Sequence, residues 1–315
     1  YIGGKYWHDP GAFVGPTTGQ QFKGVCSVFV TAAFSFSGSE LIGLASAESA
    51  EPRKSVPAAA KQVFWRITLF YIISLTLIGC LFPYNDPRLI GSSSDDATAS
   101  PFVIAIVTHG IKGLPSVVNV VILIAVLSVG NSAIYMCSRT LCSLTEQGSL
   151  PKIFGYIDRK GRPLFSIIFV SLFGLIAFVA ASDKEGAVFN WLMALSGLSS
   201  LFTWGGICIS HIQFRRALTA QGRGTDELAF ESPLGVYGSI WGLSIIILVF
   251  VAQFYVAVAP IGAKPNASDF FQAYLSFPIV LACYVGHKIW KRNWKLYKNP
   301  KDLDIDTGRR DTDLE

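Results

Sequence analysis

The sequence predicts an all-α integral membrane protein with seven transmembrane helices, the first of them broken. Of its 315 residues, 51% are hydrophobic and only 15% are charged, and the mean hydropathy is +0.45. Soluble domains contain roughly 25% charged residues, so a soluble chain of this composition could hardly cover its surface with polar groups. The apolar content and the lack of sequence repeats also exclude disordered, collagen-like and coiled-coil proteins.

Seven stretches approach the roughly 20 apolar residues that a helix needs to cross a bilayer. They are residues 24–47, 63–82, 117–137, 165–181, 187–211, 234–259 and 270–286. Two of these stretches, 165–181 and 270–286, are short, and their polar flanks must be drawn into the membrane if they are to span it. The first stretch reaches spanning length only if Glu40 lies inside it.

The basic residues set the expected orientation. Only six of the 26 Lys and Arg residues fall on one side of the membrane: Lys5, Lys23, Arg88, Lys112, Lys184 and Lys264. Because positively charged segments stay in the cytoplasm, we expect residues 1–23 to be extracellular and residues 287–315 to form a cytoplasmic tail. Asn266 starts a glycosylation sequon on the outer side, in agreement with this orientation. Topology in the lipid bilayer thus explains the net charge of +5, and no nucleic-acid partner is expected.

Polar residues interrupt the first span. The interruption consists of Phe34, Ser35, Phe36, Ser37, Gly38, Ser39 and Glu40. Gly weakens a helix, and Ser can hydrogen-bond its own backbone in non-helical geometry. A break inside a membrane is tolerated where it lines protein or a watery cavity, and its free backbone groups can then bind a charged ligand. The alternative is an intact helix that uses small residues for close packing, with Glu40 paired to a neighbour.

Other polar residues lie inside the third and fifth spans. We interpret these as possible pore-lining residues: Ser128, Asn131 and Ser132 in the third span, and Ser200, Thr203 and Trp204 in the fifth. Small residues at such positions can also serve close helix packing. In the tail, Trp290, Trp294 and Tyr297 share one helical face among basic residues, which predicts a helix lying on the anionic membrane surface. Ordinary anchoring by basic residues, without a helix, fits the same pattern.

Three motifs carry a resemblance to a known family. Phe-x-Phe-x-Gly-x-Glu occupies residues 34–40, and Glu-x-x-x-Pro-Arg-Lys-x-x-Pro occupies residues 48–57. Ser-Arg-x-Leu, Gly-x-x-Pro and Asp-Arg-x-Gly-x-Pro follow within residues 138–163. Together these resemble the amino acid permeases of the amino acid–polyamine–organocation superfamily. The segments 1–11 and 304–310 narrow the resemblance to fungal plasma-membrane permeases of the general amino acid permease type.

The resemblance implies a LeuT-type architecture of twelve spans, in which the first ten form two inverted repeats. The seven spans here then resemble the sixth to twelfth, and we expect the five preceding spans in another part of the same protein. By this likeness the backbone carbonyls of Phe34 and Ser37 bind the ammonium group of an amino acid substrate, and the Phe34 ring acts as a gate. The resemblance also implies proton symport by alternating access, with H⁺ as the coupling ion.

Two other functions compete with transport. A seven-helix receptor would share the span count and orientation, but the characteristic Asp-Arg-Tyr and Asn-Pro-x-x-Tyr motifs of such receptors are not found. A permease-like amino-acid sensor has the same sequence features as a transporter. An enzyme is not expected, because the chain has no nucleophile elbow or HExxH motif. The six cysteines form no C-x-x-C pair, so we expect no metal or other cofactor.

Overall fold

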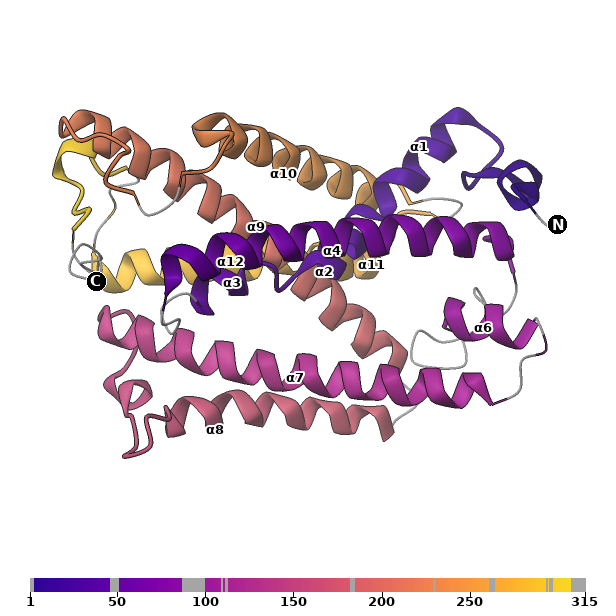
Figure 1. Ribbon diagram of the computed structural model, residues 1–315, viewed down its shortest axis with the longest axis horizontal. Helices are drawn as coiled ribbons and strands as arrows, with labels where there is room; N and C mark the ends of the chain where they lie inside the picture. Colours follow the sequence, from indigo (N-terminus) through magenta and orange to yellow (C-terminus); the bar gives the residue numbers. More distant parts are fainter. Residues whose placement is uncertain are drawn as a thin grey trace. The chain divides into compact units, whose positions relative to one another are not determined.

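The structure, a computed structural model, confirms the all-α class for the part of the chain that it describes (Figure 1). It describes residues 3–45, 51–86, 100–108, 110, 113–181, 185–228, 231–260, 264–292, 294 and 297–306. The α-helices in these residues are α1 (Thr18–Ser27), α2 (Phe29–Phe36), α3 (Leu41–Ala45), α4 (Pro52–Leu81), α6 (Pro101–Thr108), α7 (Leu114–Glu146), α8 (Leu164–Phe173), α9 (Glu185–Ala220), α10 (Gly235–Val258), α11 (Ala267–Tyr274) and α12 (Ser276–Lys291). Shorter turns are the π-helical η1 (Trp7–Gly11) and the 3₁₀-helical η4 (Lys152–Gly155), η5 (Gly174–Ala181) and η6 (Pro300–Asp302).

Five helical stretches are long and apolar enough to cross a membrane. They are Thr18–Gly43, Lys54–Leu81, Leu114–Glu146, Val188–Ala220 and Gly235–Val258. They overlap the first, second, third, fifth and sixth predicted spans. Large apolar side chains on α4 and α7 point outward, such as Phe70 at 69% exposure and Val129 at 69%. This exposure is expected where lipid is the solvent of a helix.

The two short predicted spans are less regular. The stretch 165–181 covers α8 and η5, and the apolar helix Leu164–Phe178 is shorter than the five spanning stretches. The stretch 270–286 falls on α11 and α12, which are separate helices that meet at Leu275. The count of seven spans therefore remains a prediction.

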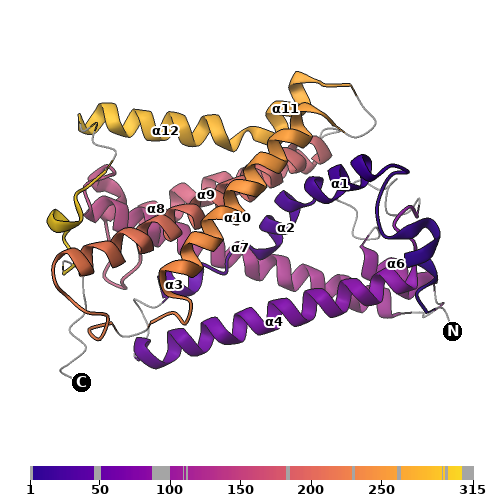
Figure 2. The same cartoon turned by 90° about the horizontal axis from the view of Figure 1, so that it is seen from above.

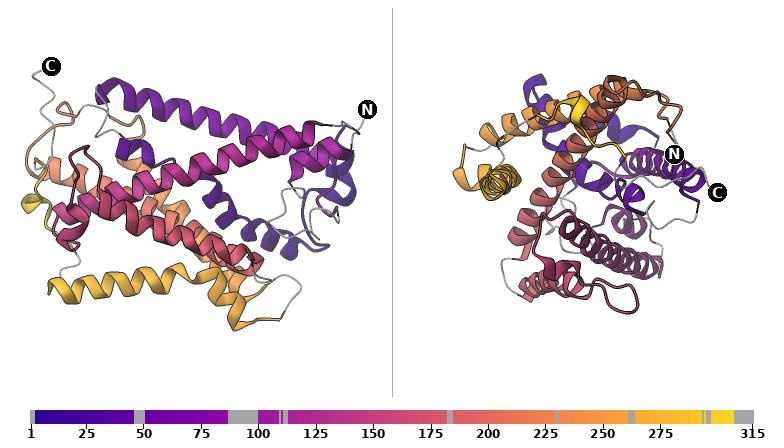
Figure 3. Two further views of the ribbon diagram at one scale, coloured as in Figure 1. Left: turned by 90° about the horizontal axis from the view of Figure 1, so that it is seen from below. Right: turned by 90° about the vertical axis from the view of Figure 1, so that its left-hand side faces the viewer.

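The chain forms two compact units. One comprises Tyr1–Ala12 and Thr68–Phe189, and the other comprises Phe13–Ile67 and Asn190–Glu315. In the first unit α7 packs against α8, and the two helices lie side by side in Figures 1 and 3. The Ser166 hydroxyl on α8 donates to the carbonyl oxygen of Phe154 at 2.8 Å, so the turn η4 is tied to the start of α8.

In the second unit α1 and α2 pack against α10 (Figure 2). The buried core of this unit joins Ala33 of α2, Leu201 of α9, and Ile246 and Val249 of α10. Helix α11 packs on α10 as well, where the Tyr274 hydroxyl donates to the Phe250 carbonyl oxygen at 3.2 Å. Helices α2, α9 and α10 are thus held together by apolar contacts around the predicted break.

The predicted surface helix in the tail is wrong beyond Lys291. Helix α12 ends there because Arg292 adopts a left-handed conformation (φ 50°) and its N–H donates back to the Ile289 carbonyl oxygen. A left-handed residue terminates a helix by satisfying carbonyls of its last turn. Trp294 and Tyr297 therefore lie outside the helix and do not share a helical face with Trp290.

The Asp-Arg-x-Gly-x-Pro motif forms a self-contained turn between α7 and α8. The Asp158 carboxylate accepts hydrogen bonds from the backbone N–H groups of Lys160 (2.9 Å) and Arg162 (2.8 Å). The Arg162 guanidinium donates to its other oxygen at 2.9 and 2.7 Å. Gly161 has φ +75°, which an L side chain would rarely adopt. Asp158 therefore fixes the shape of this turn.

We expect Asp158→Ala to loosen this turn. The change removes the acceptor for two backbone N–H groups, so their hydrogen exchange should become about fivefold faster. The measurement is hydrogen exchange by mass spectrometry over residues 158–163. Asp226→Ala, the same change in another loop, is the control. Unchanged exchange in the Asp158 variant would contradict the assigned role of this carboxylate.

The pH dependence of the turn follows from the same contacts. Hydrogen bonds from Arg162 lower the pKa of Asp158, and the bond from the Lys160 N–H acts in the same direction. The stabilisation is therefore present above the ordinary carboxyl pKa and is lost as the pH falls through the lowered pKa. The difference between variant and wild type should persist at neutral pH and disappear only in acid.

Candidate functional site

The first predicted span is broken at the expected place. Helix α2 ends at Phe36, and the next helix begins at Leu41. Between them Ser37 is extended (φ −60°, ψ 141°) and Gly38 has φ +97°. The left-handed value at Gly38 requires a residue without a side chain. The prediction of non-helical backbone within residues 34–39 is confirmed.

One oxygen of Glu40 holds the break closed. Its Oε2 accepts a hydrogen bond from the Gly38 backbone N–H at 3.0 Å and another from the Trp204 indole N–H at 3.0 Å. The first bond satisfies an N–H group that the interrupted helix leaves without a helical partner. The second bond ties the break to α9, 164 residues further along the chain. Glu40 is therefore paired with a neighbour, Trp204, as the intact-helix alternative expected, but the helix itself is broken.

A second polar contact joins the same two segments. The hydroxyl oxygens of Ser37 and Ser200 are 2.8 Å apart. The Ser200 hydroxyl also donates to the Ser196 carbonyl oxygen at 3.1 Å, which uses its only proton. We infer that Ser37 donates to Ser200. Ser200 is only 7% exposed, so this hydrogen bond lies in the interior of the unit.

Close approach of α2 and α9 makes these contacts possible. A Cβ atom added at Gly197 would lie 2.9 Å from Val30 Cγ1 and 3.0 Å from the Val30 carbonyl oxygen. Real Cβ atoms rarely come so close to backbone, so glycine is required here. Gly197 was not among the predicted site residues. The small residues Ser196, Gly197, Ser199 and Ser200 were its sequence signal, but they do not show which of them touches α2.

The break leaves hydrogen-bond acceptors open. Among the described residues, none donates to the Ser37 carbonyl oxygen or to Glu40 Oε1. The Phe34 carbonyl oxygen accepts from the Ser37 N–H at 3.1 Å, and a carbonyl can accept a second bond. These oxygens are suited to a group that carries several N–H donors and a positive charge. An alkylammonium group has both properties.

The other predicted site residues are placed less decisively. The hydroxyls of Ser35 and Thr203 donate to carbonyl oxygens of their own helices, at Thr31 (3.0 Å) and Ser199 (3.1 Å). The side chain of Phe36 is 38% exposed, and Ser39 lies in the turn of the break. Ser128, Asn131 and Ser132 are exposed on α7, in the other unit. Their role in lining a pore remains a prediction.

Asn266 is exposed and lies directly before α11, at a position open to modification. Its glycosylation remains a prediction. The structure thus brings together Ser37, Glu40, Ser200 and Trp204 out of the predicted site residues.

The comparison with protein families decides the class of protein. A family described as amino acid permease matches residues 1–300. The chain belongs to the amino acid permease family. This agrees with the resemblance drawn from the motifs, and it places the broken helix and the apolar helices in a multi-pass membrane protein. Permeases are transporters, so the expectation that the protein is not an enzyme is confirmed.

Individual permeases are similar along the whole chain. The general amino-acid permease GAP1 of Saccharomyces cerevisiae is 74% identical over 315 residues, which is 100% of this chain and 52% of that protein. The general amino-acid permease GAP2 of Candida albicans is 61% identical, over 100% of this chain and 53% of that protein. The histidine permease of Saccharomyces cerevisiae is 56% identical, over 100% and 52%. The chain thus spans about half the length of the curated relatives it matches. No solved structure matches it.

The permease should not tolerate a larger residue where α9 approaches α2 at Gly197. We expect Gly197→Ala to destabilise the folded protein by about 1–3 kcal/mol, because the new methyl group would collide with Val30 backbone. Thermal unfolding in detergent measures the effect. Gly206→Ala on the same helix is the control, since a Cβ there meets nothing within 4 Å. Equal unfolding temperatures for the two variants would show that the close approach is not required.

Glu40 and Trp204 should act as a pair. We expect a double-mutant cycle of Glu40→Ala and Trp204→Phe to show a coupling free energy of about 0.5–3 kcal/mol, because each change removes the same hydrogen bond. Thermal unfolding of the four proteins gives this value. A cycle of Glu40→Ala with Trp241→Phe, which changes an exposed Trp on α10, should be additive. Additivity in both cycles would contradict the pairing.

Proposed function

We propose that this chain supplies substrate-binding backbone to a secondary active transporter of amino acids in the plasma membrane. The observation that carries the proposal is the break after α2, where the Ser37 carbonyl oxygen and Glu40 Oε1 have no donor among the described residues. The names of the similar permeases support amino acids as the substrate class. The family match favours a transporter over a seven-helix receptor.

In this proposal the ammonium group of the substrate binds at the break. Its N–H groups donate to the Ser37 carbonyl oxygen and to the remaining acceptor position on the Phe34 carbonyl oxygen. Glu40 contributes in two ways: Oε2 keeps the turn in its binding shape, and the negative charge attracts the ammonium group. The Phe34 side chain is 40% exposed and so can cover the substrate side chain as a gate.

Transport would follow alternating access, with H⁺ as the coupling ion and the seven spans equivalent to the sixth to twelfth of a LeuT-type fold. In such transporters the substrate site lies at a discontinuous helix near the middle of the membrane. The break after α2 has this character, since Glu40 accepts from the Gly38 backbone N–H and the Ser37 hydroxyl pairs with that of Ser200. The proposed site requires no metal or organic cofactor.

Removing the charge of Glu40 should therefore reduce uptake. In the full-length permease we expect Glu40→Gln to lower amino acid uptake by about tenfold or more, since hydrogen bonds to a charged group contribute about 1.5–3 kcal/mol. The assay measures labelled amino acid uptake and surface abundance in cells that lack their own permeases. Glu146→Gln makes the same chemical change at an exposed position on α7 and serves as the control.

The outcomes separate two roles for Glu40 and distinguish a transporter from a sensor. A loss of uptake at normal surface abundance supports the proposal. Parallel losses of uptake and surface abundance would make Glu40 purely structural. Wild-type protein that reaches the surface but takes up no amino acid would favour the sensor over the transporter.

A further inference from the structure

A second polar site lies at the end of α9, away from the helix break. Gln221 directly follows this helix, and its side-chain amide points at the chain's own tail. Its Nε2 donates to the carbonyl oxygens of Leu303 (2.8 Å), Pro300 (3.1 Å) and Lys301 (3.5 Å). An amide nitrogen has two N–H donors. Gln221 therefore uses its whole donor capacity on three backbone acceptors of one short segment.

The tail is shaped to present these acceptors together. Residues Pro300–Asp302 form the 3₁₀ turn η6, and the Asn299 side chain caps it by accepting from the Lys301 N–H at 3.3 Å. A tight turn brings neighbouring carbonyl groups to one point, where a single donor can reach them. The contact depends on the backbone of the tail and not on its side chains.

A charge contact follows a few residues later. The Arg223 guanidinium donates to Asp306 Oδ1 at 2.8 Å through one nitrogen. Its other nitrogens bind Glu227 in the same loop. Because Glu227 binds Arg223 within the loop, the position of the guanidinium does not depend on the tail alone. Asp306 therefore sets the register of a segment that Gln221 recognises through its backbone.

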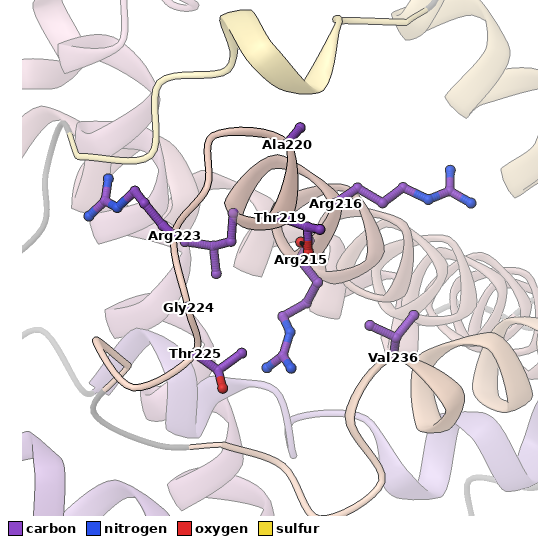
Figure 4. A pocket seen from close by; sticks show the side chains of 9 residues that line it. Arg215, Arg216, Thr219, Ala220, Arg223, Gly224, Thr225 and Val236 are labelled. Carbon is purple, nitrogen blue, oxygen red and sulfur yellow. Dashed lines mark hydrogen bonds between the residues drawn. The ribbon is translucent and has the colours of Figure 1, made fainter.

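The cavity beside this loop is not suited to bind an anion. It has a volume of about 540 Å³ and is lined by residues that include Arg215, Arg216 and Arg223. The three arginine side chains extend in different directions and do not converge (Figure 4). Arg215 is paired with Glu231 at 2.9 Å, which lowers the pKa of that carboxyl, and Arg223 is paired with Glu227 and Asp306. The positive charge is thus largely compensated by the chain's own carboxylates.

We propose that the end of α9 and the loop 221–228 form a docking site for an acidic, turn-forming peptide segment, and that residues 299–306 of the chain's own tail are its occupant. In this site Gln221 binds the backbone of one turn, and Arg223 binds one carboxylate. This proposal does not depend on the transport function, because the contacts of Gln221 and Arg223 with the tail involve no residue of the helix break.

The proposal is tested by hydrogen exchange of the tail in the full-length permease, reconstituted in lipid nanodiscs. Gln221→Glu keeps the size of the side chain but places oxygen opposite the three carbonyl groups. Asp306→Asn removes only the charge at the far end of the segment. We expect exchange over residues 299–306 to become about fivefold to tenfold faster in each variant, because Gln221→Glu removes the amide donors and Asp306→Asn removes the charge that strengthens the bond from Arg223.

Asp302→Asn is the matched control, since it makes the same charge change in the same segment at an exposed residue outside both contacts. Exchange near the wild-type rate in this control, with faster exchange in the two test variants, supports the docking site. Wild-type exchange in both test variants would overturn it, as would equal acceleration in all three. Asp306 is exposed and lies beyond the membrane helices, so its variant remains informative even if Gln221→Glu fails to fold.

Discussion

The geometry of the candidate site depends on one carboxylate oxygen. A helix interrupted among apolar segments exposes backbone groups that cost several kcal/mol each if they remain unsatisfied. Glu40 Oε2 satisfies the N–H of Gly38, and the same oxygen accepts from Trp204. Because one oxygen accepts both bonds, Glu40 Oε1 has no donor among the described residues. One oxygen of this side chain therefore stabilises the break, and under the proposed function the other is available near the substrate.

Helix α9 provides the surface on which this arrangement rests. The absence of a side chain at Gly197 lets α2 approach closely, and this approach brings Ser200 and Trp204 within hydrogen-bond distance of the break. Leu201, between them in sequence, enters the apolar core with residues of α2 and α10. Along α9, polar contacts to the break and apolar contacts to the core therefore alternate. This follows from the 3.6-residue period, which places successive residues on different faces of a helix.

The sequence predicted the place of the break but not its partners. Serines, a glycine and a carboxylate inside an apolar stretch conflict with a regular helix, and this conflict is visible locally. The contact between Glu40 and Trp204 spans 164 residues and has no local signal. The same limit explains the wrong tail helix, since aromatic spacing does not reveal the left-handed residue Arg292 that ends α12. Local pattern predicts element type, whereas pairing depends on how distant segments pack.

The polar contacts of the break and of the tail both involve α9 or the residue that follows it. Trp204, in the middle of α9, contacts the break, and Gln221, just after its end, contacts the tail about 25 Å away at a rise of about 1.5 Å per residue. A rigid displacement of α9 would alter both sets, whereas a bend between them would alter only one. Between the two sets α9 is one continuous helix. The two sets therefore report separately on the middle of this helix and on its end.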